Sequence, residues 1–150
     1  MTVVDALQAA LAVEHQAIYG YGLAAARLAG KPYTAALAAL TDAQSRRDRL
    51  VDLLRQRGVT PTPAAPAYVP PAPVTDASTA TALCLRLEHA AEGAAWDLVA
   101  AASAGDDARR LGVTWLGVAA SRAARWAGAG APAEPALPGK PPSSIAASPP

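Results

Sequence analysis

Apolar residues recur at intervals of three and four along four stretches of the chain, which is the spacing that places side chains on one face of an α-helix. The four stretches cover residues 3–29, 33–57, 76–103 and 107–127. Thr2 with Asp5 is typical of a helix start, and Gly30 is a natural stop for the first helix. The pattern therefore predicts an all-α protein built from four long helices.

The stretch between the second and third predicted helices, residues 59–75, has a different composition. Its six prolines exclude helix and favour an extended, polyproline-like chain. These 17 residues reach roughly 50 Å at about 3.1 Å each, whereas a 25-residue helix is roughly 37 Å long. The linker is long enough to traverse the bundle, so we expect two antiparallel hairpins joined by a long Pro-rich crossover. A simple up-down bundle, the alternative, needs only a short loop here.

A short motif occurs twice, at residues 11–17 and 85–91, and reads Leu-x-aliphatic-Glu-His-x-Ala in both copies. In each copy the glutamate, Glu14 or Glu88, falls on the apolar face of its predicted helix, where an ionised side chain is costly to bury without a partner. Because the copies share one helical register, we expect an approximate internal two-fold that brings the two glutamates together at mid-bundle. Chance similarity in an alanine-rich chain is the alternative.

Three further segments carry a resemblance to a known family: residues 14–22, the run Arg46-Arg47-Asp48-x-Leu50, and the Tyr68-x-Pro70 loop. One inward glutamate on each of the first and third helices, with the long crossover between the hairpins, resembles the ferritin-like superfamily. More narrowly, the chain is similar to a bacterial ferritin-like domain family of unknown function, over roughly residues 3–130. The resemblance implies a ferritin-like four-helix bundle and implies no particular activity.

A ferritin-like fold raises the question of a di-iron site, which takes a Glu from each of two helices and a Glu-x-x-His from each of the other two. Glu14 and Glu88 match the first pair. The second pair is missing, because residues 33–57 hold neither Glu nor His and residues 108–133 hold no Asp, Glu or His. The histidine after each glutamate projects about 100° away around the helix. We therefore expect a degenerate metal site with no cofactor.

The predicted inner faces of the second and fourth helices carry arginines where the missing ligands would stand. These faces are predicted to consist of Leu37, Leu40, Gln44, Arg47, Val51 and Leu54, and of Leu111, Trp115, Val118, Arg122 and Arg125. We predict that Arg47 and Arg122 form charge-assisted hydrogen bonds to Glu14 and Glu88. The alternative for Arg47 is that its long side chain reaches solvent beside Arg46.

Other polar residues are weaker candidates for this core. Gln44 lies on the same predicted face as Arg47, and Glu92 follows Glu88 by one turn. Tyr19, Tyr21 and Tyr68 could each hydrogen-bond a core carboxylate, but we expect them to fill space among alanines. A solvated face with local ion pairs is expected for Asp42, Arg46 and Asp48.

The sides of the first and third helices offer a second set of candidates. They are His15 with Tyr19, and His89 with Trp96. Glycines beside them leave room for a partner helix or a small ligand. Ordinary surface or inter-helix packing is the alternative.

Charge and composition exclude several classes of function. The chain has 13 Lys and Arg against 12 Asp and Glu with no basic tract, so neither nucleic acid nor a membrane surface is expected as a partner. No apolar run is long enough for a membrane span. Cys84 is the single cysteine, which excludes an internal disulfide and fits a reducing compartment. With no signal-peptide pattern at the start, we expect a cytoplasmic protein.

We interpret residues 3–127 as one bundle and residues 128–150, rich in Pro, Ala and Gly, as an extended tail. The expected function is that of a non-enzymatic binding or structural module with an ion-paired polar core and no catalytic residue. Alanine- and glycine-rich helix faces favour a homodimer.

Two alternatives stay open. One is a metal-dependent oxidoreductase with an atypical carboxylate site, in which Glu14, Glu88 and Glu92 hold iron or manganese. The other is a small anionic ligand bound in the degenerate metal pocket, held by Arg47 and Arg122.

Overall fold

The structure is a computed structural model and describes residues 1–128. Four α-helices make up most of it: α1 (Val3–Ala25), α2 (Gly30–Gln56), α3 (Ala77–Ala101) and α4 (Asp107–Gly128). The prediction of an all-α four-helix bundle is confirmed. Within the described part of the chain, no helix combines the length and apolar character that crossing a membrane requires. The predicted tail lies outside the described residues, apart from Gly128.

Local sequence sets where the helices begin. The Thr2 hydroxyl accepts a hydrogen bond from the Asp5 backbone N–H at 3.1 Å, and the Asp5 carboxylate accepts one from the Thr2 backbone at 2.8 Å, which caps α1 as predicted. Asp76 caps α3 in the same way. Gly30 differs from expectation: α1 already ends at Ala25, and Gly30 begins α2 with a φ of 60°. This left-handed conformation, which glycine adopts readily, reverses the chain between the two helices.

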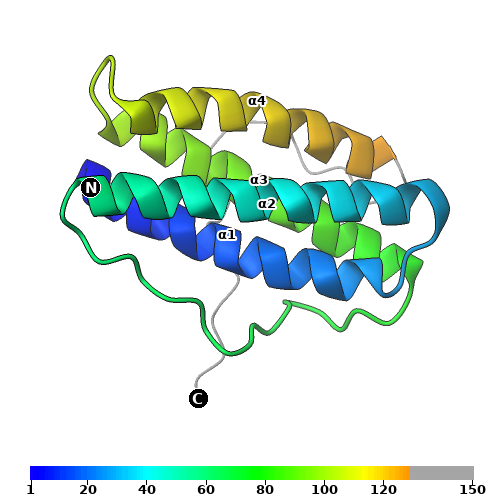
Figure 1. Cartoon of the computed structure of the whole chain (residues 1–150). Coiled ribbons are helices and arrows are strands. Elements are labelled where there is room, and N and C mark those ends of the chain that lie inside the picture. The colour runs from blue at the N-terminus through cyan, green and yellow to red at the C-terminus, as the bar shows by residue number, and fades with distance from the viewer. Residues whose placement is uncertain (129–150) are drawn as a thin grey trace.

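The helices form two antiparallel hairpins, α1 with α2 and α3 with α4, and α2 runs parallel to α3 (Figure 1). An extended segment, residues 57–76, joins the hairpins and follows α1. Gln8 donates a hydrogen bond to the Thr60 carbonyl at 2.8 Å, and further along α1 the ring of Tyr19 packs edge-on against Tyr68. Thr60 contacts the early part of α1 and Tyr68 contacts a later part, so the linker runs along α1 from one end of the bundle toward the other. It is therefore a crossover, as its length predicted.

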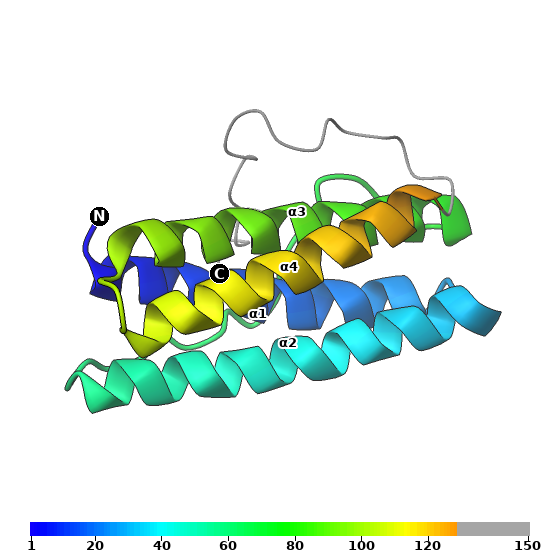
Figure 2. The same ribbon diagram turned by 90° about the horizontal axis from the view of Figure 1, so that it is seen from above.

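In the interior, α1 packs against both α2 and α3, and α3 packs against α4. Viewed from above, α4 runs at an angle to α2, and the two separate toward Gly128 (Figure 2). Two apolar clusters fill the bundle. The first includes Leu7, Leu11, Leu50, Leu54, Leu98 and Trp115, and the second includes Tyr21, Leu83, Leu87 and Trp126. Glu14 on α1 and Glu88 on α3 lie where the two clusters meet.

The inner faces of α2 and α4 differ from the predicted ones. The buried positions of α2 are Ala36, Ala39, Ala43, Leu50, Leu53 and Leu54, and those of α4 are Ala108, Gly112, Trp115, Ala119, Ala123 and Trp126. Leu37, Gln44 and Val118, predicted to face inward, are exposed. The leucine spacing was misleading because alanine and glycine allow helix axes to approach closely, so the small residues turn inward and some large ones turn out.

Candidate functional site

Among the described residues, Glu14 and Glu88 are the charged side chains buried most completely. Glu14 is 0% exposed and Glu88 is 1% exposed. A carboxylate taken out of water in this way is costly unless its charge is paired or a proton neutralises it. What surrounds these two carboxyl groups therefore decides what the centre of the bundle can do.

Glu14 is held by an arginine of α2. The Nε of Arg46 donates a hydrogen bond to Oε1 of Glu14 at 2.9 Å, and the Arg46 side chain is itself only 13% exposed. The guanidinium carbon lies 5.1 Å from the centroid of the Trp115 ring, within the range of a cation–π interaction. Burial raises the pKa of Glu14 to about 7, although Arg46 opposes this rise. Desolvation thus outweighs the ion pair at this site.

Glu88 is held by a tyrosine of α1. The hydroxyl of Tyr21, which is almost fully buried, donates a hydrogen bond to Oε1 of Glu88 at 2.5 Å. Burial raises the pKa of Glu88 to about 7, and the Tyr21 hydrogen bond opposes this rise. Burial, and then the charge of Glu88, raise the pKa of Tyr21 well above its ordinary value. The hydroxyl therefore stays protonated at neutral pH and is the donor in this hydrogen bond.

A second arginine, Arg122 of α4, lies beside both carboxyl groups without hydrogen-bonding either. Its Nη2 forms an ion pair with Asp42 of α2, and its positive charge lowers the pKa of Glu14 and of Glu88. Within residues 1–128, the buried Nη1 of Arg122 and the buried Oε2 of Glu14 have no hydrogen-bond partner. The polar core is therefore a network of two acids, two arginines and a tyrosine that spans all four helices.

The prediction that Arg47 pairs with a core glutamate was wrong. Arg47 is about a third exposed and donates to Asp48 at 2.7 Å on the surface, while its neighbour Arg46 occupies the inward position. Arg46 itself was expected on the solvated face. The error arose because the buried face of α2 was assigned from its leucines. The buried alanines at 36, 39 and 43 continue at helical spacing to Arg46 and Leu50. Reading the alanines as the buried stripe would have selected Arg46.

Arg122 and Asp42 also differ from expectation. Arg122 was predicted to bond a core glutamate, but it pairs with Asp42, which was expected to pair locally on its own helix. The pairing joins α2 to α4 across 80 residues of sequence. Gln44 is exposed and takes no part in the network. Glu92 is half-buried; burial raises its pKa, opposed by His89.

The lateral candidates divide between two faces. His15 and Tyr19 both face the crossover: His15 Nε2 lies 3.2 Å from the Thr62 carbonyl oxygen, and the Tyr19 ring centroid lies 5.7 Å from that of Tyr68. The chain's own linker thus covers the face on which a partner helix or ligand was considered. On α3, His89 is half-buried and Trp96 is 53% exposed. His15 and Tyr19 thus contact the crossover, whereas the charge of His89 acts on Glu92.

A di-iron centre needs several carboxylates and histidines converging on one point, and the residues here do not fit it. No group of three or more His, Cys, Asp and Glu side chains comes together anywhere in residues 1–128. Glu14 is instead bonded to a guanidinium and Glu88 to a phenol hydroxyl. Cys84 is buried nearby, and burial raises the pKa of its thiol to about 12, so it is a poor nucleophile. The network's evident chemistry is proton binding near neutral pH.

Comparison with known proteins gives a structural relative. The chain is 36% identical to a conserved hypothetical protein, rv2844, from Mycobacterium tuberculosis, whose crystal structure superposes with a TM-score of 0.79. The match covers 83% of this chain and 94% of that one. No curated protein matches the chain. A family model described as a domain of unknown function, DUF4439, matches residues 6–142, and the chain therefore belongs to this family.

Proposed function

We propose that this protein is a non-enzymatic binding module with a ferritin-like fold, in which protein side chains take the place of a metal centre. The fold assignment is supported by the two antiparallel hairpins, the crossover and the pair of inward glutamates on α1 and α3. The observation that carries the functional proposal is that each glutamate already has a protein partner, Arg46 for Glu14 and Tyr21 for Glu88.

Electrostatics supports the same conclusion. A divalent cation bound between the glutamates would lie close to Arg46 and to Arg122, and like charges at such range repel strongly where water is excluded. Both carboxyl groups have pKa values of about 7, so protons compete with a metal for them at neutral pH. The arginines thus stabilise the carboxylates in the role that metal ions would otherwise fill.

The test is elemental analysis of protein purified without an affinity tag or chelator, repeated after incubation with ferrous and with manganous ions. We expect metal well below one atom per chain, with no change in the Glu14→Ala and Glu88→Ala variants. Near-stoichiometric metal that disappears in those two variants would overturn the proposal and make a metal-dependent oxidoreductase the leading alternative.

A further inference from the structure

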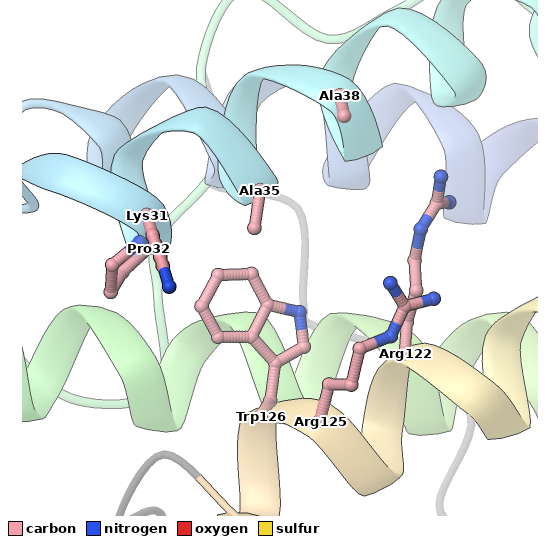
Figure 3. Close-up of a pocket in the computed structure, with 7 residues that line it drawn as sticks. All are labelled: Lys31, Pro32, Ala35, Ala38, Arg122, Arg125 and Trp126. Carbon is pink, nitrogen blue, oxygen red and sulfur yellow. The ribbon is translucent and has the colours of Figure 1, made fainter.

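A pocket of about 280 Å³ lies between the first turns of α2 and the last turns of α4 and includes Arg122 in its lining. This is near the lower end of the range for small-molecule sites, about 300–1,000 Å³. Figure 3 shows the indole of Trp126 in the middle of the lining, with Lys31 on one side, Arg125 and Arg122 on the other, and Ala35 facing it from α2. The pocket thus combines an apolar body with cations at its two sides.

The charge of this pocket is positive. Three of its lining residues are cations, and Arg122 forms an ion pair with Asp42. In the described part of the chain neither Lys31 nor Arg125 forms an ion pair; Arg125 only donates its Nε–H to the Ser121 carbonyl at 3.3 Å. Two of the pocket's positive charges therefore have no counter-ion among residues 1–128.

The start of α2 adds to this positive potential. Unlike α1 and α3, α2 has no side-chain cap at its N-cap residue, Ala29, and its first turn contains no acidic residue. The backbone N–H groups of a helix start carry partial positive charge, which favours an anion nearby. Lys31 and Pro32, which line the pocket, belong to this turn.

We propose that the pocket binds a small organic anion, one carboxylate or similar acidic group attached to a flat apolar body. Lys31 and Arg125 attract the anionic group from the two sides of the indole, and the body packs against Trp126 and the alanines of α2, because an aromatic ring contributes both area and a preferred stacking geometry. This inference rests on the proposed binding function and names its ligand class. It differs from the anion site expected from sequence, which relied on Arg47 and the core.

The test uses the full chain and two matched probes, naphthalene-2-carboxylate and its neutral analogue naphthalene-2-carboxamide, titrated by calorimetry. We expect the carboxylate to bind at one site per chain and the carboxamide to bind at least about tenfold more weakly. The variants Lys31→Gln and Arg125→Gln should each weaken carboxylate binding about tenfold, the loss expected on removing one charge-assisted hydrogen bond. Both residues are exposed, so the fold should survive, which circular dichroism checks.

Arg55→Gln is the matched control, because Arg55 is an exposed arginine at the opposite end of α2, and its substitution should leave binding unchanged. Three results would each overturn the inference: no carboxylate binding at millimolar concentration, equal binding of the carboxamide, or equal losses in all three variants. Inorganic phosphate binding as tightly as the carboxylate would also overturn it, since the apolar body would then contribute nothing. Metal bound at the glutamates would refute the proposed function but would not change the titration of the pocket. A titration without binding would refute the pocket inference but not the proposal of a metal-free core.

Discussion

Two neighbouring arginines of α2 provide a matched test of the polar core. Arg46→Met removes the partner of a buried glutamate and keeps most of the aliphatic volume, whereas Arg47→Met removes a partly exposed arginine whose partner, Asp48, is 70% exposed. Surface ion pairs contribute about 0–1 kcal/mol, so we expect Arg47→Met to change the free energy of unfolding by about 0.5 kcal/mol or less. Breaking a buried pair costs about 3–5 kcal/mol when the remaining charge cannot be neutralised.

Glu14 can be neutralised by a proton, which makes the cost of Arg46→Met depend on pH. Below the wild-type pKa of about 7 the carboxyl group is protonated in both proteins, and the variant loses only packing and the cation–π contact with Trp115. Near pH 8.5 the wild type is ionised and paired, while in the variant Glu14 stays protonated. At 1.36 kcal/mol per pH unit, the variant loses about 2 kcal/mol more of its free energy of unfolding than the wild type between pH 7 and 8.5. With about 1 kcal/mol for packing and the cation–π contact, the total loss is about 3 kcal/mol.

Urea unfolding followed by circular dichroism, near pH 5.5 and near pH 8.5, measures both quantities in the two variants and the wild type. A loss of about 3 kcal/mol corresponds to a fall in Tm of about 10 °C for a chain of this size. The reasoning fails if Arg47→Met is as destabilising as Arg46→Met, or if the Arg46→Met loss does not grow between the two pH values. Partial recovery near pH 8.5 in Glu14→Gln/Arg46→Met would assign the loss to the unpaired carboxyl group.

Four further predictions follow from individual contacts. Burial raises the pKa of Glu14 and Glu88 from 4.5 to about 7, so between these pH values the folded state holds protons that the unfolded state releases. The free energy of unfolding should therefore fall by about 3 kcal/mol per carboxyl group as pH rises from 4.5 through 7. In the Glu→Gln variants the urea midpoint should depend less on pH. Tyr21→Phe should cost about 1–3 kcal/mol in urea unfolding and raise the pKa of Glu88 measured by NMR, since an acceptor loses its donor. Gly112→Ala should lower the Tm, because its Cβ would lie 2.8 Å from a backbone oxygen of α3, whereas Gly117→Ala, facing open space, should raise it by favouring the helix. The homodimer stays a prediction: light scattering should give twice 15.1 kDa, and a mass of 15.1 kDa would contradict it.

The sequence was sufficient for the fold because its signals act over long stretches. Helical spacing gave four helices, and the proline-rich linker was long enough to imply a crossover, which the contacts of Thr60 and Tyr68 with α1 confirm. The repeated motif located Glu14 and Glu88, because a glutamate on an apolar face stands out against leucine and alanine. These features depend on periodicity and length, and the choice of rotational register does not affect them.

The arginine partner of Glu14 depends on the rotation of α2, and the leucine spacing did not determine that rotation. A rotation by one residue, about 100°, exchanges Arg46 for Arg47, and close packing on alanine decides it. Tyr21 was among the tyrosines considered as partners of a core carboxylate, but its hydrogen bond to Glu88, 67 residues away in sequence, depends on how α1 and α3 pack together. The pocket around Trp126 depends on the separation of α2 and α4, which the residue pattern of one helix alone does not determine.

The central claim is that Arg46 and Tyr21, and no metal ion, hold the two buried glutamates. Carboxyl-carbon NMR of protein labelled at the glutamate side chains tests it directly, through the signals of Glu14 and Glu88 before and after one equivalent of manganous ion. The account predicts that both signals titrate near pH 7 and keep their intensity when manganese is added. Selective loss of both signals at one equivalent, or titration of both at the ordinary value near 4.5, would contradict it.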